Sequence, residues 1–519
     1  MLAGGVLAVV LALAAALVLI LSGSGEAPPD TGATALVPAD ALAYVNLSTD
    51  PSRPAVGRAR TLASRFPDWP LLAGAALTRL DSIVGGPRHA GFARDIRPWL
   101  GDEASLALVP AGDASAQLLV ALQVSRPARA RSFVTGAGAA PAGAYRGLRL
   151  LAYPSGTELA FIGRYLVAGP DIAVRAAIDA FRGRAASLAR DPAYARAAAS
   201  EPADRVLDAY LPAAGIRRLV APRTGVAGAI GLLLDRPSLQ GAAVSLSASS
   251  QGARVLVDSV GGKDSSSFTP TLQSVLPSGS TLMVDVPDLG RAAPALLGAA
   301  ATAGIGANIG PLLGRLGSAL AAEGVNVHNV VSLFSGETAV AISPVREPAT
   351  TPALLIVARL RKPAAARSEL ASLEGPVSAL FSSSGSDAIQ VPELADHQVG
   401  GATVHELQLG PGLQLNYAVL DGLFVLSTSM TAIDGVVQRS HSLADDASYK
   451  ATLPDRPGPV SSLVFGDVSR LLALGEQIGL TSGARTRQLL PDLSRIRAIG
   501  VSSTSRGRAT TTELRLEIP

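Results

Sequence analysis

The sequence WLGDEASLALVPAGDASAQLLVALQVSRPARARSFV, from Trp99 to Val134, is followed later in the chain by a second version of itself. The second version, LFSGETAVAISPVREPATTPALLIVARLRKPAAARSEL, occupies 333–370. Both versions predict a short apolar strand, a turn, a longer apolar strand and a helix whose first turn contains proline, where proline costs no hydrogen bond. The aligned landmarks are Glu103 with Glu337, Pro110 with Pro344, and Arg126-Pro127 with Lys362-Pro363.

The correspondence extends over most of the chain. Its further landmarks are Pro38 with Pro277, Val167 with Val425, Leu188 with Leu443, Tyr194 with Tyr449, Tyr210 with Phe465, and Gly252 with Gly507. We interpret this register as a tandem duplication with a first half at 36–265 and a second half at 270–519. The last glycine pair predicts a two-residue hairpin turn in each half, because glycine adopts the positive backbone angles that such a turn needs.

The connections between predicted strands decide the fold class. Hairpins favour antiparallel sheets, and the chain lacks the strict strand–helix alternation of a doubly wound fold. The closing strand, Glu513–Ile518, alternates apolar and polar residues, so one face is buried and the other solvated. We predict the α+β class: two tandem homologous domains with mainly antiparallel sheets and flanking helices, preceded by one transmembrane helix.

Several local elements follow from the same patterns. A helical pattern spans Pro54–Leu80, with breaks predicted at Pro67 and Pro70. Further predictions are three short strands within Tyr145–Ala168, helices at Ile172–Arg182 and Met430–Arg439, and an inserted surface loop at Phe381–Gly401.

Composition bounds the class of protein. A chain of 519 residues with 48% hydrophobic and 16% charged residues is long enough for two domains and too apolar to be disordered. The net charge of +3 is small and the basic residues are scattered, so we expect no nucleic-acid partner. The absence of cysteine excludes disulfides, thiolate nucleophiles and cysteine-bound zinc.

The N-terminus carries the strongest targeting signal. Residues 2–21 are uninterrupted apolar residues, and twenty helical residues at about 1.5 Å each cover the roughly 30 Å hydrocarbon core of a bilayer. We predict an uncleaved transmembrane anchor at 1–22 and a flexible tether at 23–35, with the bulk of the chain extracytoplasmic; a cleaved signal peptide is the alternative. No Lys or Arg precedes the segment, so charge does not fix its orientation.

Four phrases resemble a known family. VPADALAYVNL, WLGDEASLALVP, RPARARSF and SLARDPAY are similar to bacterial proteins that carry the domain of unknown function 3352, and SLADDASYKATLP repeats the last phrase in the second half. The resemblance covers about 36–519. It implies an N-terminally anchored envelope protein and brings no activity and no catalytic residues.

Residues that could carry chemistry are few. The histidines are His89, His328, His397, His405 and His441, and none has the four-residue spacing of a helical metal site, so we expect surface histidines. Glu103 and Glu337 recur at the start of equivalent strands, and two carboxylates brought close together can perform acid–base chemistry. We expect each glutamate instead to cap or ion-pair within its own half, and Tyr194 and Tyr449 to anchor a loop to the sheet.

The glycine- and serine-rich stretches do not match catalytic or nucleotide motifs. Gly304–Gly310 has its third glycine one residue too late for a dinucleotide loop. Gly261-Gly262-Lys263 lacks the first glycine and the final Ser or Thr of a phosphate loop, and Ser382–Asp387 predicts a loop without a nucleophile elbow. We therefore predict no catalytic, cofactor-binding or metal-binding residues.

The expected function is that of a membrane-anchored, extracytoplasmic protein without enzymatic activity, which binds or scaffolds a protein or an apolar or lipid ligand. The apolar ligand is suggested by the Gly/Ala/Leu-rich stretch Leu289–Leu320. The alternative is an envelope hydrolase acting on cell-wall or lipid substrates, which would need serine, histidine and acidic groups gathered in one cleft.

Overall fold

The computed structural model describes residues 28–86, 91–112, 115–220, 237–261, 266–292, 334–342, 353–380, 383–384, 389–390, 394–410, 413–454, 458–477 and 483–519. The predicted anchor at 2–21 lies outside these residues. Within them, no helix is both long enough and apolar enough to span a bilayer.

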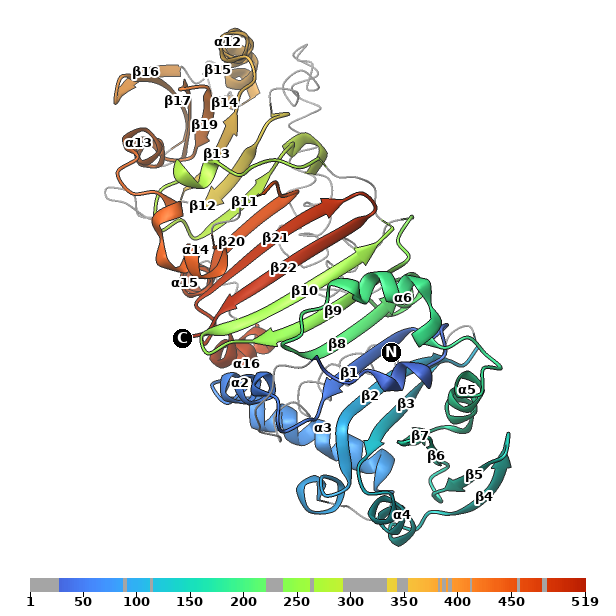
Figure 1. Cartoon of the computed structure of the whole chain (residues 1–519). Helices are drawn as coiled ribbons and strands as arrows, with labels where there is room; N and C mark the ends of the chain where they lie inside the picture. Colours follow the sequence, from blue (N-terminus) through green and yellow to red (C-terminus); the bar gives the residue numbers. More distant parts are fainter. Residues whose placement is uncertain are drawn as a thin grey trace.

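Twenty strands form one antiparallel sheet that runs diagonally through the molecule (Figure 1). The strands of the first half are β1 (Ala43–Ser48), β2 (Leu100–Pro110), β3 (Ala116–Val124), β4 (Ala140–Tyr145), β5 (Leu148–Ala152), β6 (Glu158–Ile162), β7 (Tyr165–Gly169), β8 (Arg205–Pro212), β9 (Gly241–Ala248) and β10 (Gly252–Val260). Those of the second half are β11 (Leu282–Val286), β12 (Thr338–Ile342), β13 (Leu354–Arg359), β16 (Leu394–Val399), β17 (Ala402–Gly410), β18 (Leu413–Leu420), β19 (Leu423–Ser427), β20 (Ser462–Asp467), β21 (Ala498–Arg506) and β22 (Ala509–Glu517). A separate hairpin joins β14 (Ser383–Ser384) to β15 (Ile389–Gln390). The α+β class with antiparallel strands is confirmed.

The second half repeats the strand pairings of the first. β1 lies between β2 and β8, as β11 lies between β12 and β20. β3 pairs with β2 and β7, as β13 pairs with β12 and β19. The ribbon β4–β7 corresponds to β16–β19, and β8–β9–β10 to β20–β21–β22. Short bridges also correspond: Pro38 faces Ser187, and Pro277 faces Ser442.

The two halves share the sheet through β10 and β22, which pair over nine residues from Gly252↔Glu517 to Val260↔Ala509. Predicted as two domains, they are joined by a continuous hydrogen-bonded ladder at the centre of the sheet, where β10 and β22 lie side by side (Figure 1). Core packing crosses the same boundary, because Ile518 belongs to the main core of the first half.

The glycine turn predicted before β22 is confirmed, whereas the one predicted before β10 is wrong. The turn of the second half is Gly507-Arg508, and Gly507 has the expected positive φ of 58°. In the first half the turn is Ser250-Gln251, closed by Ser249 N–H donating to the Gly252 carbonyl at 2.9 Å. Gly252 instead begins β10, where a Cβ atom would stand 2.0 Å from the Leu516 carbonyl oxygen. Glycine is therefore needed there for the close approach of β22.

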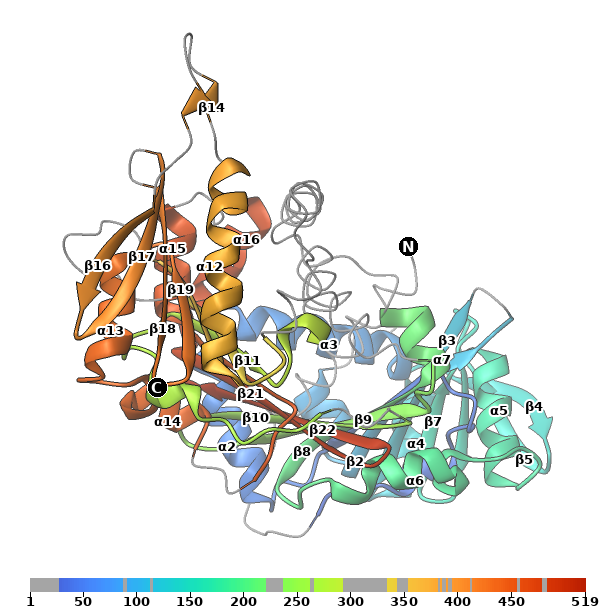
Figure 2. The same cartoon turned by 90° about the horizontal axis from the view of Figure 1, so that it is seen from above.

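Helices cover both faces of the sheet. They are α2 (Pro54–Ala63), α3 (Trp69–Val84), α4 (Pro127–Gly136), α5 (Asp171–Phe181), α6 (Pro192–Ala197), α7 (Ala213–Gly215), α12 (Pro363–Leu380), α13 (Met430–Gln438), α14 (Ala447–Thr452), α15 (Val468–Gln477) and α16 (Ala484–Leu493). In the first half, α2, α3 and α4 pack on one face and α5 and α6 on the other. In the second, α12 and α13 lie on opposite sides of β19 (Figure 2).

Most local predictions are confirmed, with four differences. Pro127 and Pro363 begin α4 and α12, and Pro67 separates α2 from α3. Pro70, however, lies in the first turn of α3 and does not break it. The three strands predicted in Tyr145–Ala168 are present as β5, β6 and β7, and the difference is an additional strand, β4, which precedes them from Ala140. In the predicted inserted loop Phe381–Gly401, the described residues form β14, β15, β16 and the Gly400-Gly401 turn.

The fourth difference concerns the predicted tether at 23–35. Its described part, residues 28–35, is packed against the first half and includes the short 3-10 helix η1 (Gly32–Ala35). Ala33 is fully buried, and Asp30 accepts hydrogen bonds from Gln123 and Arg164. This segment is therefore fixed to the sheet rather than free.

Candidate functional site

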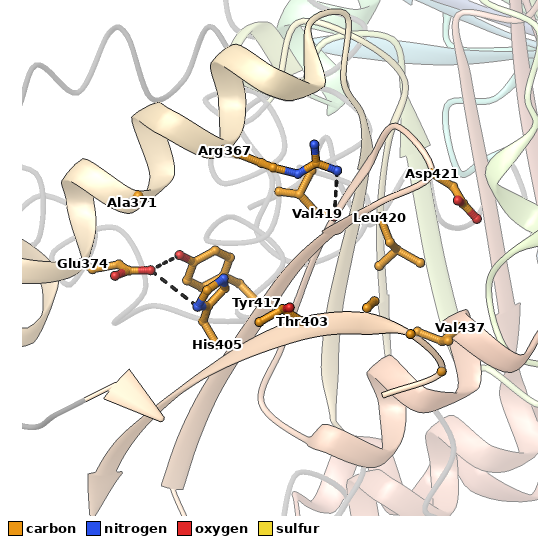
Figure 3. A pocket seen from close by; sticks show the side chains of 13 residues that line it. Arg367, Ala371, Glu374, Thr403, His405, Tyr417, Val419, Leu420, Asp421 and Val437 are labelled. Carbon is orange, nitrogen blue, oxygen red and sulfur yellow. Dashed lines mark hydrogen bonds and ion pairs between the residues drawn. The ribbon is translucent and has the colours of Figure 1, made fainter. Parts of the chain in front are cut away.

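A hollow of about 670 Å³ lies between α12 and the strands β17 and β18 of the second half (Figure 3). Its size falls in the range of small-molecule binding sites. The glycine turn between β16 and β17 and the turn after β18 form its rim. The polar side chains that line it are Arg367, Glu374, Thr403, His405, Tyr417 and Asp421.

One end of the hollow is lined by Glu374, His405 and Tyr417, and Asp396 contacts His405 from outside this lining. The Tyr417 hydroxyl donates to Glu374 Oε1, and His405 Nδ1 lies 3.7 Å from the same oxygen. His405 Nδ1 also lies 2.7 Å from Asp396 Oδ1, and its ring stacks on Tyr417 with the centroids 4.7 Å apart. Burial, and then the bond to Glu374, raise the pKa of Tyr417 above its ordinary value. The phenol therefore remains a hydrogen-bond donor.

The other end of the hollow is positively charged. Arg367 is exposed on α12, and its guanidinium donates to the Val419 carbonyl at 3.4 Å. Because arginine has five N–H donors, most of its hydrogen-bonding capacity remains available to a ligand. Asp421, at the rim, pairs with Arg439 at 2.9 Å.

The first half shows what the same positions look like when they are packed as core. His405 pairs with Tyr417 across β17 and β18, and the corresponding pair across β5 and β6 is Leu151 with Leu159. Leu159 is fully buried, and Leu151 packs against the same core. The second half has therefore replaced a leucine pair beneath the helix with a histidine–tyrosine pair that borders a hollow.

The predicted surface position is confirmed for His397 and His441 and not for His405. His397 Nε2 lies 3.0 Å from Glu406 Oε2 and is half exposed, and His441 is exposed. His405 is partly buried, because it lies beneath α12. His89 and His328 lie outside the described residues. Across the described part of the chain, no group of three or more acidic and histidine side chains has the geometry of a metal site.

Glu103 and Glu337 cap their own halves, as predicted. Glu103 is fully buried, and its Oε1 accepts the Ala33 N–H at 2.9 Å in η1. Glu337 accepts the Leu272 N–H at 2.8 Å in the 3-10 helix η6 (Leu272–Ser274). Ala33 and Leu272 are equivalent by the same offset as Pro38 and Pro277. The recurrence of the two glutamates thus has a structural cause, because each satisfies an orphan donor of a short helix.

Glu337 does have a carboxyl neighbour, which the sequence did not point to. Asp285 is fully buried beside it, and neither carboxyl oxygen accepts a hydrogen bond from an N–H or O–H group among the described residues. Burial, followed by the charge and hydrogen bond of Glu337, raises the pKa of Asp285 to about 9. This raised pKa favours the protonated acid at neutral pH, with Glu337 as the neighbouring carboxylate.

The first half has asparagine, Asn46, at the position equivalent to Asp285. Asn46 lies between Ser105 and Asp208 across the sheet, whereas Asp285 lies between Ala339 and Leu463. Asn46 donates to Asp208 at 3.4 Å and accepts from Ser105 at 2.8 Å. A signal was present in the sequence: an aspartate stands where the aligned strand has asparagine.

The two predicted tyrosine anchors also occupy equivalent places. Tyr194 makes edge contacts with Tyr44 and Tyr210, at 6.3 and 5.3 Å between ring centroids. Tyr449 contacts Phe465 at 5.4 Å. These rings hold α6 and α14 against the sheet, as expected.

The remaining motifs contribute no described site. Gly304–Gly310 and Lys263 lie outside the described residues, as does most of Leu289–Leu320. Gly261 has a positive φ of 101° and meets the Ser238 backbone, which is a structural role. Of Ser382–Asp387, the described Ser383 and Ser384 form β14.

A family model described as "Protein of unknown function (DUF3352)" matches residues 1–518. The chain belongs to the DUF3352 family. The phrases SLARDPAY and SLADDASY have a physical basis in this DUF3352 chain. Asp191 and Asp446 cap α6 and α14 by accepting backbone N–H groups, and Leu188 and Leu443 are buried.

No curated protein matches the DUF3352 chain at a significant level. Among solved structures, it is similar to one titled "Structure of crystal form I of TP0453", with 11% identity and a TM-score of 0.27, over 45% of this chain and 81% of that one. For "Structure of crystal form III of TP0453" the identity is 10% and the TM-score 0.25, over 47% of this chain and 90% of that one.

Proposed function

We propose that this DUF3352 protein is a non-enzymatic binding protein of the bacterial envelope, which holds a small polar ligand in the hollow beside α12. The observation that carries the proposal is the contrast between the halves. In the first half Leu159 is fully buried and Leu151 packs against the same core, whereas His405 and Tyr417 border an open space in the second. Burying polar groups beside a cavity costs stability, so such a replacement is expected where a ligand is bound.

The ligand proposed here is polar rather than apolar. The stretch Leu289–Leu320, which suggested a lipid, lies mostly outside the described residues. The hollow itself is lined by a guanidinium, carboxylates, an imidazole and a phenol. Such groups lose hydration without compensation when an apolar molecule covers them.

Anchoring and orientation rest on the sequence of 2–21, which is long enough to span a bilayer. We propose that these residues hold the protein in the membrane and that the sheet is extracytoplasmic. Replacing Val9 and Leu13 with arginine should release the protein from the membrane fraction, and protease added outside intact cells should cleave the wild-type chain. Wild-type protein that resists protease in intact cells, but not in lysed ones, would place the sheet on the cytoplasmic side.

We also propose that the two halves arose by duplication. The equivalent strand pairings support this. The junction supports it too, because Ser250 and Gly507, the first residues of the two equivalent turns, are 257 positions apart, and the paired residues Leu256 and Glu513 are also 257 positions apart. Equivalent residues face each other in antiparallel strands only where a local twofold axis passes between them.

The alternative, an envelope hydrolase, lacks a supporting observation. A serine hydrolase needs a histidine that bonds both a serine and a carboxylate. In the described part of the chain, His405 contacts Asp396 and Glu374, and His397 contacts Glu406. Each of these two histidines is thus paired with an acid.

Ligand binding can be tested with the full chain extracted from its membrane in mild detergent. Native mass spectrometry should detect a bound small molecule in the wild-type protein. Ala371→Trp places a large ring into the hollow from an exposed helix position and should remove that adduct. The matched control is Thr135→Trp, the equivalent exposed position of α4, which should retain it. Absence of any adduct from wild-type protein, or its retention in Ala371→Trp, would refute the proposed binding function.

A further inference from the structure

The hollow carries opposite charges at its two ends. Arg367, Ala371 and Glu374 are spaced four and three residues apart on α12, so they lie on one face of the helix. Figure 3 shows Arg367 and Glu374 extending from α12 toward β18, with the small side chain of Ala371 between them. At about 1.5 Å per residue, the backbones of the two charged residues are separated by roughly 10 Å along the helix axis.

The negative end is formed by the Glu374 carboxylate, which accepts a hydrogen bond from Tyr417 and lies 3.7 Å from His405 Nδ1. Asp396, which does not line the hollow, lies 2.7 Å from the same nitrogen and offsets any positive charge on that ring. This end therefore favours an ammonium group.

The positive end consists of the Arg367 guanidinium. Within the described residues its one hydrogen bond is the long contact to the Val419 carbonyl, and it makes no ion pair there. A planar guanidinium with free N–H groups matches a carboxylate in bidentate geometry. This end therefore favours a carboxylate.

We propose that the hollow binds a short extended peptide of about three residues by its two free ends. The carboxylate would meet Arg367, and the ammonium group would meet Glu374. An extended chain spans about 3.3–3.6 Å per residue, so three residues match the roughly 10 Å that separates the backbones of Arg367 and Glu374 along α12. Ala371 and the Gly400-Gly401 turn leave room for the peptide backbone between these ends.

This inference rests on the proposed binding function, and it names the ligand class. It predicts that both termini of the peptide contribute to binding, because each pairs with a group of opposite charge. Capping either end should therefore weaken binding, whereas the chemistry of the middle side chain should matter less.

The test uses isothermal titration calorimetry of the full chain in detergent with tri-alanine. We expect the N-acetylated and C-amidated forms to bind at least tenfold more weakly than tri-alanine. Arg367→Gln should weaken binding of tri-alanine at least tenfold, so that this variant binds tri-alanine and its C-amidated form equally and still prefers tri-alanine to the N-acetylated form. Glu374→Gln should likewise weaken binding of tri-alanine, and it should bind tri-alanine and the N-acetylated form equally. Arg131→Gln, at the equivalent position of α4 in the first half, is the matched control and should change neither.

The outcomes separate this inference from the proposed function. If tri-alanine neither binds nor displaces a co-purified molecule that Ala371→Trp removes, the hollow binds something else and the peptide inference is wrong. Equal affinity for free and capped tri-alanine would also overturn it. Circular dichroism of both charge variants should match that of wild type, since Arg367 is exposed and Glu374→Gln retains an acceptor for Tyr417.

Discussion

The carboxyl group of Asp285 provides the sharpest test of the structure. It is fully buried between Ala339 and Leu463, and burial beside Glu337 raises its pKa from 3.8 to about 9. Replacing it with asparagine keeps the size and supplies N–H donors for Glu337, as Asn46 does for Asp208 in the first half. We therefore expect Asp285→Asn to stabilise the protein at neutral pH.

The magnitude follows from proton linkage. In the unfolded chain Asp285 ionises near its ordinary pKa, whereas in the folded protein it holds its proton up to about pH 9. A group whose pKa is raised in the folded protein contributes fully to stability at pH values below its unfolded pKa. This contribution is lost as the pH rises toward its folded pKa. At about 1.4 kcal/mol per pH unit, folding at pH 7 costs at most about 4 kcal/mol for this proton, whereas at pH 4.5 it costs only about 1 kcal/mol.

The assay is urea unfolding of the full chain in detergent, followed by far-ultraviolet circular dichroism at pH 4.5 and pH 7. Circular dichroism is suitable because both tryptophans, Trp69 and Trp99, lie in the first half and would miss a local transition around β11. Asp285→Asn should raise the free energy of unfolding at pH 7 and change it little at pH 4.5.

The reciprocal variant is Asn46→Asp, which brings a carboxyl group beside Asp208 and Glu103. It should destabilise the protein at pH 7 and much less at pH 4.5. The reasoning is refuted if Asp285→Asn lowers stability equally at both pH values, because Asp285 would then contribute through contacts that an amide cannot make, rather than through its proton.

Three further predictions concern the first half and the junction. Burial raises the pKa of Glu103 to about 7, so the contribution of Glu103 to stability should fall by up to about 3 kcal/mol as pH rises from 4.5 to 7, and Glu103→Gln should remove that part of the pH dependence in urea titrations. A pH profile unchanged by Glu103→Gln would contradict this. Trp99→Ala should lower the free energy of unfolding by about 3–5 kcal/mol in the same titrations, because Trp99 is buried and donates a hydrogen bond to the Asp95 carbonyl. A decrease below about 1 kcal/mol would be incompatible with that packing. Leu256→Pro should lower the free energy of unfolding by about 3 kcal/mol or more, because β10 is hydrogen-bonded to strands on both sides. Leu256→Ala, which keeps the backbone N–H, should lower it much less. Equal effects of the two variants would mean that the hydrogen-bonded ladder contributes little to stability.

The sequence contained most of the chain's local structure. Apolar periodicity and turn residues are local signals, so the helices α5 and α13, the proline starts of α4 and α12, and most of the strands followed from them. The internal repetition predicted the correspondence between strands, and the structure has the same pairings in both halves. The roles of Glu103 and Glu337 followed for the same reason, because a recurring acid at a strand start needs a recurring donor nearby.

Other features depended on contacts between residues far apart in the chain. Which strand of each half lies at the junction is set by the match between β10 and β22, and both strands have the same alternating pattern as several others. The packing of residues 28–35 depends on Gln123 and Arg164, more than 90 residues away. Polar composition alone therefore indicated a tether where tertiary contacts produce an ordered segment.

The hollow and the Asp285–Glu337 pair are the clearest cases of tertiary control. No spacing in the sequence joins Arg367 on a helix to His405 and Tyr417 on two strands, or Asp285 to an acid more than fifty residues later. Hydrophobic pattern and turn chemistry act over a few residues, so the sequence by itself determined the elements and their repetition. Burial, charge and cavity shape arise only when the sheet brings distant strands together, so the tertiary structure decided which polar residues became a site.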